Sequence, residues 1–97
     1  MDDKIPFEEI IADLNEQSGK KFRHKSAITQ SLIRARFRDG FTLADFKRVH
    51  RIKAAEWKGT DMDQYLCPTT LYRPSKFEKY LNQIEPQSQN MAEFGIP

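Results

Sequence analysis

The sequence contains a single cysteine and no long hydrophobic run. Cys67 alone cannot form an internal disulfide, which excludes a disulfide-stapled scaffold. No run of apolar residues is longer than three, so no segment is predicted to span a membrane. The first nine residues are acidic and lack the apolar core of a signal peptide. These absences predict a cytoplasmic protein that folds without disulfides.

Residues that build metal sites and enzyme active sites are also scarce. His24, His50 and Cys67 are 26 and 17 residues apart, which is not a paired ligand spacing, so we predict no metal site. The chain has no glycine-rich phosphate loop and no G-x-S-x-G motif. Cys67 could be drawn with either histidine as a catalytic dyad, but any small protein offers such a pair, so this pairing is no evidence for an enzyme. We therefore expect a binding module, not an enzyme, with no catalytic residue and no cofactor.

Charged residues are abundant but unevenly distributed. The net charge of the 97 residues is +2. Residues 20–58 carry +9, from twelve Lys and Arg against three acidic residues, whereas residues 1–19 carry −5 and residues 59–97 carry −2. A dense positive centre favours an anionic partner, either nucleic acid or an acidic protein surface. An ordinary solvated helix surface gives the same pattern, so charge alone leaves both interpretations open.

Hydrophobic periodicity predicts three main helices. The first begins near Pro6 and ends at Gly19, and its apolar residues fall within one arc. The second runs from about Ser26 to Asp39, with two apolar arcs that predict a central helix packed on both sides. The third covers residues 41–57, with Thr42 as its N-cap and Asp45 completing a capping box.

The C-terminal third of the chain predicts shorter elements. Residues 61–66 form a helical turn in this interpretation, and Ser75 and Glu78 resemble a capping box that opens a short helix. No strand periodicity is present. We predict an all-α fold, a compact single-domain bundle of three main helices plus one or two short C-terminal helices. The helical domain is expected to span residues 1–84, and the polar residues 85–97 are expected to form a flexible tail.

The third helix presents a cationic arc beside its apolar face. At 100° per residue, the basic side chains lie off the core stripe, except Lys53, whose stem is expected to lie across Trp57 or Phe46 with its ammonium reaching outward. A stripe of this kind neutralises phosphates and gives sequence-tolerant, salt-sensitive binding. The candidate DNA-binding residues are Lys47, Arg48, Arg51, Lys53 and Lys58.

A second set of residues is a candidate protein-binding surface. Arg34 and Arg38 lie together at positions i and i+4 of the second helix, where like charges repel slightly unless a partner or an acidic neighbour compensates. Ile52 points away from the core stripe and either packs on a neighbouring segment or contacts a partner. Trp57 either stacks on a base or, as its position on the apolar stripe favours, packs in the core. The candidate partner-binding residues are Arg34, Arg38, Ile52 and Trp57.

A basic loop, KKFRHK, occupies residues 20–25 between the first two helices. Basic residues around an aromatic ring are typical of a phosphate-and-stacking site. The alternative, which we favour for Phe22, is that the ring packs in the core while the charges stay solvated.

Several motifs together carry a family resemblance over residues 5–83. The chain resembles the conserved C-terminal domain of phage replisome-organiser proteins, which is related to the DnaD-like replication-initiation domain. The motifs follow one another in order and are Ile10-Ile11-x-x-Leu14-Asn15, Gly19-Lys20-Lys21-Phe22, Ile33-x-x-Arg36, Gly40-Phe41-x-x-x-Asp45-Phe46-Lys47-x-Val49, Lys53-x-x-x-Trp57, Tyr65-Leu66-x-Pro68-x-Thr70-Leu71 and Lys76-Phe77-Glu78-x-Tyr80-Leu81-Asn82.

The resemblance implies a helical domain that helps assemble the replisome in an infected bacterial cell. Family members are associated with DNA binding and with contacts to the helicase or its loader. The aromatic-x3-aliphatic-x3-Trp motif of the DnaD-like relatives falls by spacing on Val49, Lys53 and Trp57, where only the tryptophan matches.

Two functions follow as expectations. The first is a module that binds the host helicase loader, an AAA+ ATPase, and either recruits or inhibits it. The second is a single-stranded DNA-binding module that uses the cationic arc of the third helix. The family domain usually follows an N-terminal DNA-binding domain, whereas Met1 here lies almost at the domain start, so both an excised domain and a free-standing inhibitor stay open. A homodimer is a further open expectation.

Overall fold

Five α-helices and one 3-10 helix make up residues 5–83, the part of the chain that the computed structural model describes. No strand occurs within this range, and the all-α prediction is confirmed. The predicted tail at residues 85–97 lies outside the described residues. None of the described helices is long and apolar enough to cross a membrane. The elements are α1 (Phe7–Ser18), α2 (Ala27–Arg38), α3 (Leu43–Trp57), η2 (Asp61–Tyr65), α4 (Pro68–Leu71) and α5 (Pro74–Leu81).

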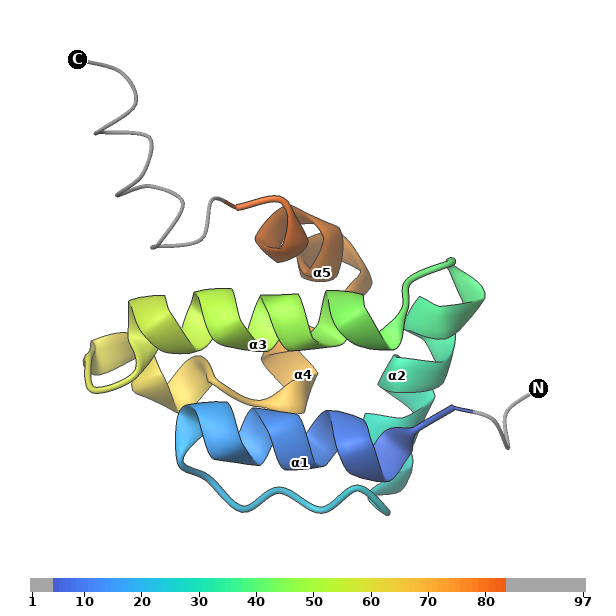
Figure 1. Ribbon diagram of the computed structural model, residues 1–97, viewed down its shortest axis with the longest axis horizontal. Coiled ribbons are helices and arrows are strands. Elements are labelled where there is room, and N and C mark those ends of the chain that lie inside the picture. The colour runs from blue at the N-terminus through green and yellow to red at the C-terminus, as the bar shows by residue number, and fades with distance from the viewer. Residues whose placement is uncertain (1–4, 84–97) are drawn as a thin grey trace.

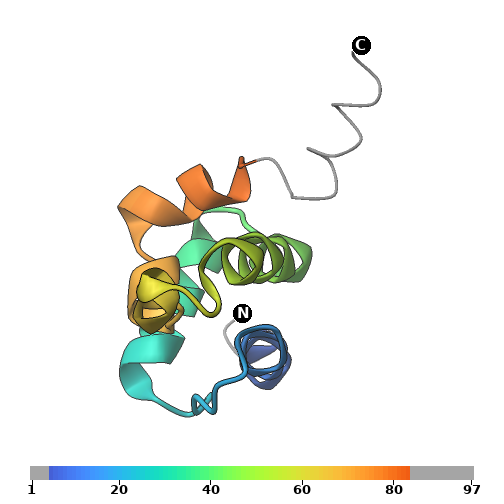
Figure 2. The same ribbon diagram turned by 90° about the vertical axis from the view of Figure 1, so that its left-hand side faces the viewer.

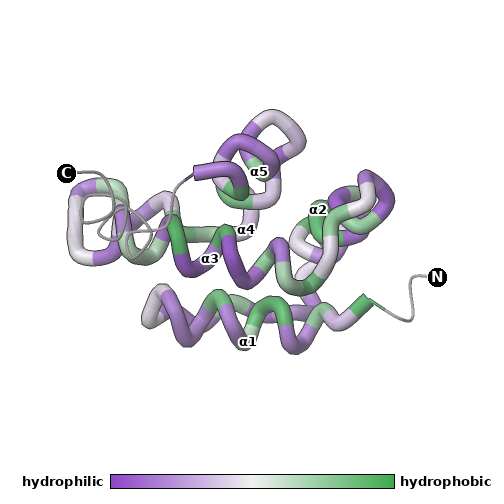
Figure 3. The backbone as a smooth tube through the Cα atoms, turned by 45° about the horizontal axis from the view of Figure 1, so that its top comes forward, coloured by the Kyte–Doolittle hydropathy of each residue, from purple (hydrophilic) through white to green (hydrophobic). Residues whose placement is uncertain are grey.

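Helices α1 and α3 lie side by side and run in the same direction (Figure 1). Ile10 and Leu14 of α1 face Phe46 and Val49 of α3, and all four side chains are at most 1% exposed. Hydrophobic and hydrophilic residues alternate along both helices (Figure 3), as expected for helices with one buried face. Burying one apolar stripe from each helix therefore forms the core of the fold.

The central helix is α3, which packs against α1, α5 and η2. The prediction that the second helix would be central is wrong, since α2 packs mainly on α4 and leaves Ile28 64% exposed. The physical reason is the width of the apolar face on α3, because Ile52, which the predicted core stripe left out, is buried as well. In the view turned by 90°, α1 and α5 lie on opposite sides of α3 (Figure 2).

Local signals set most helix ends. The Thr42 hydroxyl accepts the Asp45 N–H at 3.4 Å, and the Asp45 carboxylate accepts the Thr42 N–H at 2.9 Å, so the predicted capping box is confirmed. Gly19 ends α1 with φ at 75°, a left-handed conformation that favours glycine. The predicted capping box at Ser75 is wrong, because α5 already begins at Pro74, whose fixed φ suits the first helical position.

A cluster of aromatic rings joins the C-terminal elements to α3. The Phe46 ring lies 4.7 Å from the Phe77 ring and 5.0 Å from the Tyr72 ring, centroid to centroid. Leu71 and Tyr72 are fully buried. Aromatic pairs such as Phe46–Phe77 stabilise a fold by about 0.5–1.5 kcal/mol each, in addition to the contribution from burial of their apolar area.

Candidate functional site

The cationic arc of α3 lies on the outer face of the helix, between α1 and α5. At 100° per residue, Lys47 and Arg51 share this face with the exposed Ala44 and Ala55, and Lys58 follows directly after the last residue of the helix. Lys47 is paired across to α1, with its Nζ 3.1 Å from the Glu9 Oε2. Part of the positive charge that the sequence placed on this face is therefore already neutralised.

Arg48 fastens the end of α5 to α3. Its Nε donates to the Leu81 carbonyl at 2.9 Å, and its Nη2 donates to the Gln83 carbonyl at 3.3 Å. Carbonyls at the end of a helix have no partner within the helix, and a cation there satisfies them and complements the helix dipole. The guanidinium of Arg48 thus has a structural role at the α3–α5 contact.

Lys53 does not reach solvent, contrary to the expectation that its ammonium would lie outside. The residue is 3% exposed. Its Nζ lies 4.0 Å from the centre of the Trp57 ring and 4.4 Å from that of Tyr80. The same nitrogen donates to the Glu56 Oε1 at 2.6 Å, a bond that lowers the pKa of Glu56. Lys53 therefore contributes to the core and offers no charge to an external phosphate.

The four candidate partner-binding residues do not form one surface. Ile52 and Trp57 are 2% and 8% exposed, so both side chains pack in the interior. Arg34 lies over the Phe7 ring at 5.5 Å, and Arg38 is exposed at the end of α2. Arg38 is the last residue of α2, before α3 begins, whereas Trp57 is the last residue of α3, which is about 22 Å long.

An exposed apolar corner lies at η2, where the sequence predicted a helical turn but no function. Met62 and Tyr65 are 40% and 43% exposed. The Tyr65 ring packs edge-to-face on Trp57 with centroids 6.4 Å apart, and Trp57 in turn contacts Tyr80 at 5.7 Å. We call Met62, Tyr65 and the Trp57 beneath them the η2 corner. Two apolar side chains within a turn rich in acidic residues are the sequence signal for this corner.

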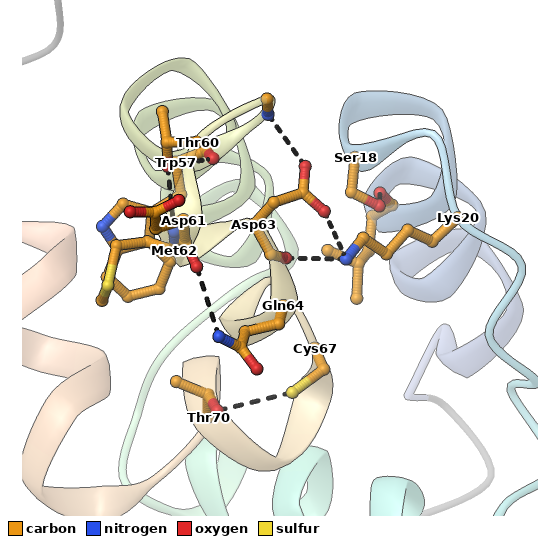
Figure 4. A network of polar contacts seen from close by, with 12 residues as sticks. Ser18, Lys20, Trp57, Thr60, Asp61, Met62, Asp63, Gln64, Cys67 and Thr70 are labelled. Atoms are coloured by element: carbon orange, nitrogen blue, oxygen red, sulfur yellow. Dashed lines mark hydrogen bonds and ion pairs between the residues drawn. The ribbon is translucent and has the colours of Figure 1, made fainter.

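Hydrogen bonds from neighbouring elements hold the η2 corner in place (Figure 4). Lys20 reaches across from the end of α1, with its Nζ 2.8 Å from the Asp63 Oδ1 and 2.6 Å from the Asp63 carbonyl oxygen. The other carboxylate oxygen of Asp63 accepts the Gly59 N–H at 2.9 Å. These contacts, with the Lys20 hydrogen bond as the largest, lower the pKa of Asp63. Thr60 caps η2 by accepting the Met62 N–H at 3.0 Å.

A buried polar chain connects three elements. His50 is fully buried, with its Nδ1 2.7 Å from the Asp13 Oδ2 and its Nε2 2.6 Å from the Tyr72 hydroxyl. Burial lowers the pKa of His50, although the hydrogen bond to Asp13 opposes the shift. Neutral His50 therefore donates from Nδ1 to Asp13 and accepts from Tyr72 at Nε2. Both ring nitrogens are satisfied internally, and this is a structural role.

No set of side chains in residues 5–83 has the composition of a metal site, since no three His, Cys, Asp or Glu residues lie together there. A groove of about 670 Å³ lies at the beginning of α1, lined by Ile5, Pro6, Phe7, Glu8, Glu9, Ala12, His24, Lys25 and Gln30. Its wall combines apolar surface with charges of both signs.

The comparisons with known proteins give one match. The model of the conserved phage C-terminus family matches residues 10–82. No curated protein and no solved structure matches the chain. The matched range begins in α1 and ends one residue beyond α5, so it contains α2, α3, η2, α4 and α5 in full. This chain belongs to the conserved phage C-terminus family.

Proposed function

We propose that this chain is a phage DNA-replication module that binds the host helicase loader, an AAA+ ATPase, and either recruits or inhibits it. Membership in a family of phage proteins supports the setting. The resemblance to DnaD-like replisome organisers supports the choice of partner. The observation that carries a protein-binding function is the η2 corner, with Met62 and Tyr65 exposed on a buried Trp57. The activity we assign is binding, without catalysis.

The composition and rigidity of the η2 corner suit a protein interface. Tyr, Trp and Met are enriched at such interfaces, where a few well-packed aromatic side chains carry most of the affinity. The Tyr65 ring is already packed on Trp57, and Lys20 anchors Asp63 between the two exposed side chains. Binding at this corner therefore orders few additional groups, which reduces its entropic cost.

The test is titration of purified loader with the wild-type protein and with a Met62→Ala, Tyr65→Ala double variant. We expect the double variant to raise Kd roughly tenfold or more, since truncation of two interface side chains costs at least about 1–2 kcal/mol. Ile28→Ala is the matched control, because Ile28 is exposed but lies on α2. A double variant that binds like wild type, or a loader that binds neither protein, contradicts the proposal.

Two further readouts complete the assignment. The ATPase rate and single-strand binding of the loader, measured with and without this protein, distinguish recruitment from inhibition. Light scattering of the free protein at the same concentration establishes whether it enters the complex as a monomer or as the homodimer that the sequence left open.

Single-stranded DNA binding through α3 is the second candidate function. It is favoured by one observation, namely that the outer arc of α3 carries Lys47 and Arg51, followed directly by Lys58, and no acidic residue of that helix. The informative variant is Arg51→Glu with Lys58→Glu, which leaves the Arg48 contact to α5 intact. If DNA binding at low salt survives this change, α3 is not the DNA site. Loss of DNA binding with loader binding retained would separate the two surfaces.

A further inference from the structure

A second basic surface lies outside α3, in the segment that joins α1 to α2. We call residues 20–25 the basic arm. Its side chains alternate in exposure, with Lys20, Phe22 and His24 half-buried and Lys21, Arg23 and Lys25 exposed. Such alternation is typical of extended backbone, in which successive side chains point to opposite sides. The three outward residues are all basic.

The course of the arm accounts for its extended shape. The arm leaves α1 at Gly19 and returns to the start of the same helix, where Lys25 lines one groove with Pro6 and Phe7 (Figure 1). The twelve residues of α1 span about 18 Å. The four steps from Gly19 to Arg23 cover about 14 Å when the backbone is nearly fully extended, and His24 and Lys25 then lie in a turn. This turn leads into α2, with the Ser26 N–H 3.5 Å from the Arg23 carbonyl oxygen.

The inward residues of the arm are fixed at several points. Lys20 is anchored on Asp63, as described above. The Asn15 side chain brackets Phe22, since its Nδ2 donates to the Phe22 carbonyl at 3.0 Å and its Oδ1 accepts the Phe22 N–H at 2.7 Å. The Phe22 ring packs against the core, and the Gln30 Nε2 donates to the His24 carbonyl at 2.9 Å. The outward cations therefore extend from a backbone that is held in one shape.

The outward cations of the arm differ from Lys47 and Arg48 of α3, which have partners on α1 and at the end of α5. Lys21, Arg23 and Lys25 make no ion pair and no side-chain hydrogen bond with any residue in the range 5–83. Glu8 and Glu9 line the groove beside Lys25, and Glu9 is paired with Lys47. The positive charge of the arm is thus available to an external anion.

We propose that the basic arm binds the phosphate backbone of a single-stranded nucleic acid. Lys21 and Arg23 lie about 6.6 Å apart along an extended chain, twice the rise per residue, and Lys25 continues the row from the turn. A fixed row of cations matches a row of phosphates along one strand. A protein interface would need an apolar centre, and the arm offers none on its outward side. The contact carries no base readout and is sequence-tolerant.

This site is separate from the η2 corner and from the outer face of α3, and it does not depend on loader binding. Neutralisation of three phosphates on a single strand predicts a slope of log K against log salt of about −2. Lowering the salt tenfold, from about 0.5 M to 50 mM, should therefore raise the affinity on the order of a hundredfold.

The test measures fluorescence anisotropy of a labelled oligothymidylate, with no loader present, across a range of salt concentrations. The arm variant is Lys21→Gln, Arg23→Gln, Lys25→Gln. The matched control, Arg38→Gln, Lys76→Gln, Lys79→Gln, removes three cations of α2 and α5 that lie outside both the basic arm and the cationic arc of α3. We expect the arm variant to lose on the order of a hundredfold in affinity at 50 mM salt and most of the salt slope, and the control to lose less than about threefold.

Three outcomes would overturn the proposal. The first is the absence of wild-type binding at low salt. The second is equal loss in the arm variant and the control, which would mean that affinity follows net charge. The third is tighter binding of polyglutamate than of the oligonucleotide at equal charge, which would assign the arm to an acidic protein. Unchanged thermal melting of the arm variant, expected because the three side chains make no ion pair or side-chain hydrogen bond within residues 5–83, confirms that any loss reports on binding.

Discussion

Replacing Lys53 tests whether this buried cation belongs to the core. Its ammonium contacts the faces of Trp57 and Tyr80, and a desolvated cation–π contact contributes roughly 1–2 kcal/mol. The ion pair with Glu56 adds less than about 0.5 kcal/mol, because half of the Glu56 side chain is exposed to solvent. Lys53→Met keeps the aliphatic stem and should lower the free energy of unfolding by about 1–2 kcal/mol. Lys53→Ala also removes the stem and should cost about 2–3 kcal/mol.

Urea denaturation followed by tryptophan fluorescence measures both variants, with m-values checked for constancy. Lys58→Met is the control, because Lys58 is exposed and its replacement should change stability by less than about 0.5 kcal/mol. A Lys53→Met protein as stable as the control would refute the reasoning. So would a Lys53→Met protein that keeps its stability but loses nucleic-acid affinity, since that result would place the ammonium at the surface.

Three further predictions concern polar side chains that are buried or half-buried. Burial lowers the pKa of His50 in the folded protein, whereas in the unfolded chain this histidine titrates near pH 6.5. The free energy of unfolding should therefore fall as the pH drops below about 6.5, by up to about 1.4 kcal/mol per pH unit. Urea titrations at pH 7.5 and 5.5 should show this loss, and His50→Gln should reduce it. In the wild-type protein, the buried Arg36 Nη1 donates to the Tyr72 carbonyl at 2.9 Å. Arg36→Met leaves this buried carbonyl without a hydrogen bond and should lower Tm by roughly 10 °C in calorimetry. Asn15→Ala removes both bonds to the Phe22 backbone and should speed amide exchange at Phe22 with a loss of about 1–2 kcal/mol; unchanged exchange would mean that other contacts hold the basic arm.

Periodicity and capping residues were sufficient to predict the main helices. Gly19 ends α1, and Thr42 with Asp45 starts α3, because these signals act within one turn of backbone. The four-residue helix α4 was not predicted, since Pro68 starts it after a residue that proline keeps extended. Which helix is central also depended on tertiary packing, because apolar arcs on α2 do not reveal that Ile28 stays exposed.

The candidate residues were harder to place, since a helical wheel gives the direction of a side chain but not what it meets. Lys47, Arg48 and Lys53 share one helix, yet their partners come from α1, from the end of α5 and from the aromatic core. The contacts of Lys47 with Glu9, of Arg48 with Leu81 and of Lys53 with Gln83 join residues 30 to 38 positions apart, too far for a local sequence pattern to predict. The η2 corner and the basic arm were visible only as a turn and a loop, because their exposure is set by the elements around them.

The hydrogen bonds of Lys20 to Asp63 join the basic arm to the η2 corner (Figure 4). One side chain thus begins the proposed nucleic-acid track and anchors the turn that carries Met62 and Tyr65. Any ligand whose binding strengthens or strains that contact changes the free energy of binding at the other surface, and linkage requires the effect to be equal in both directions. The ammonium group of Lys20 thus connects two surfaces whose residues are 43 positions apart in sequence. Occupancy of either surface therefore changes the affinity of the other.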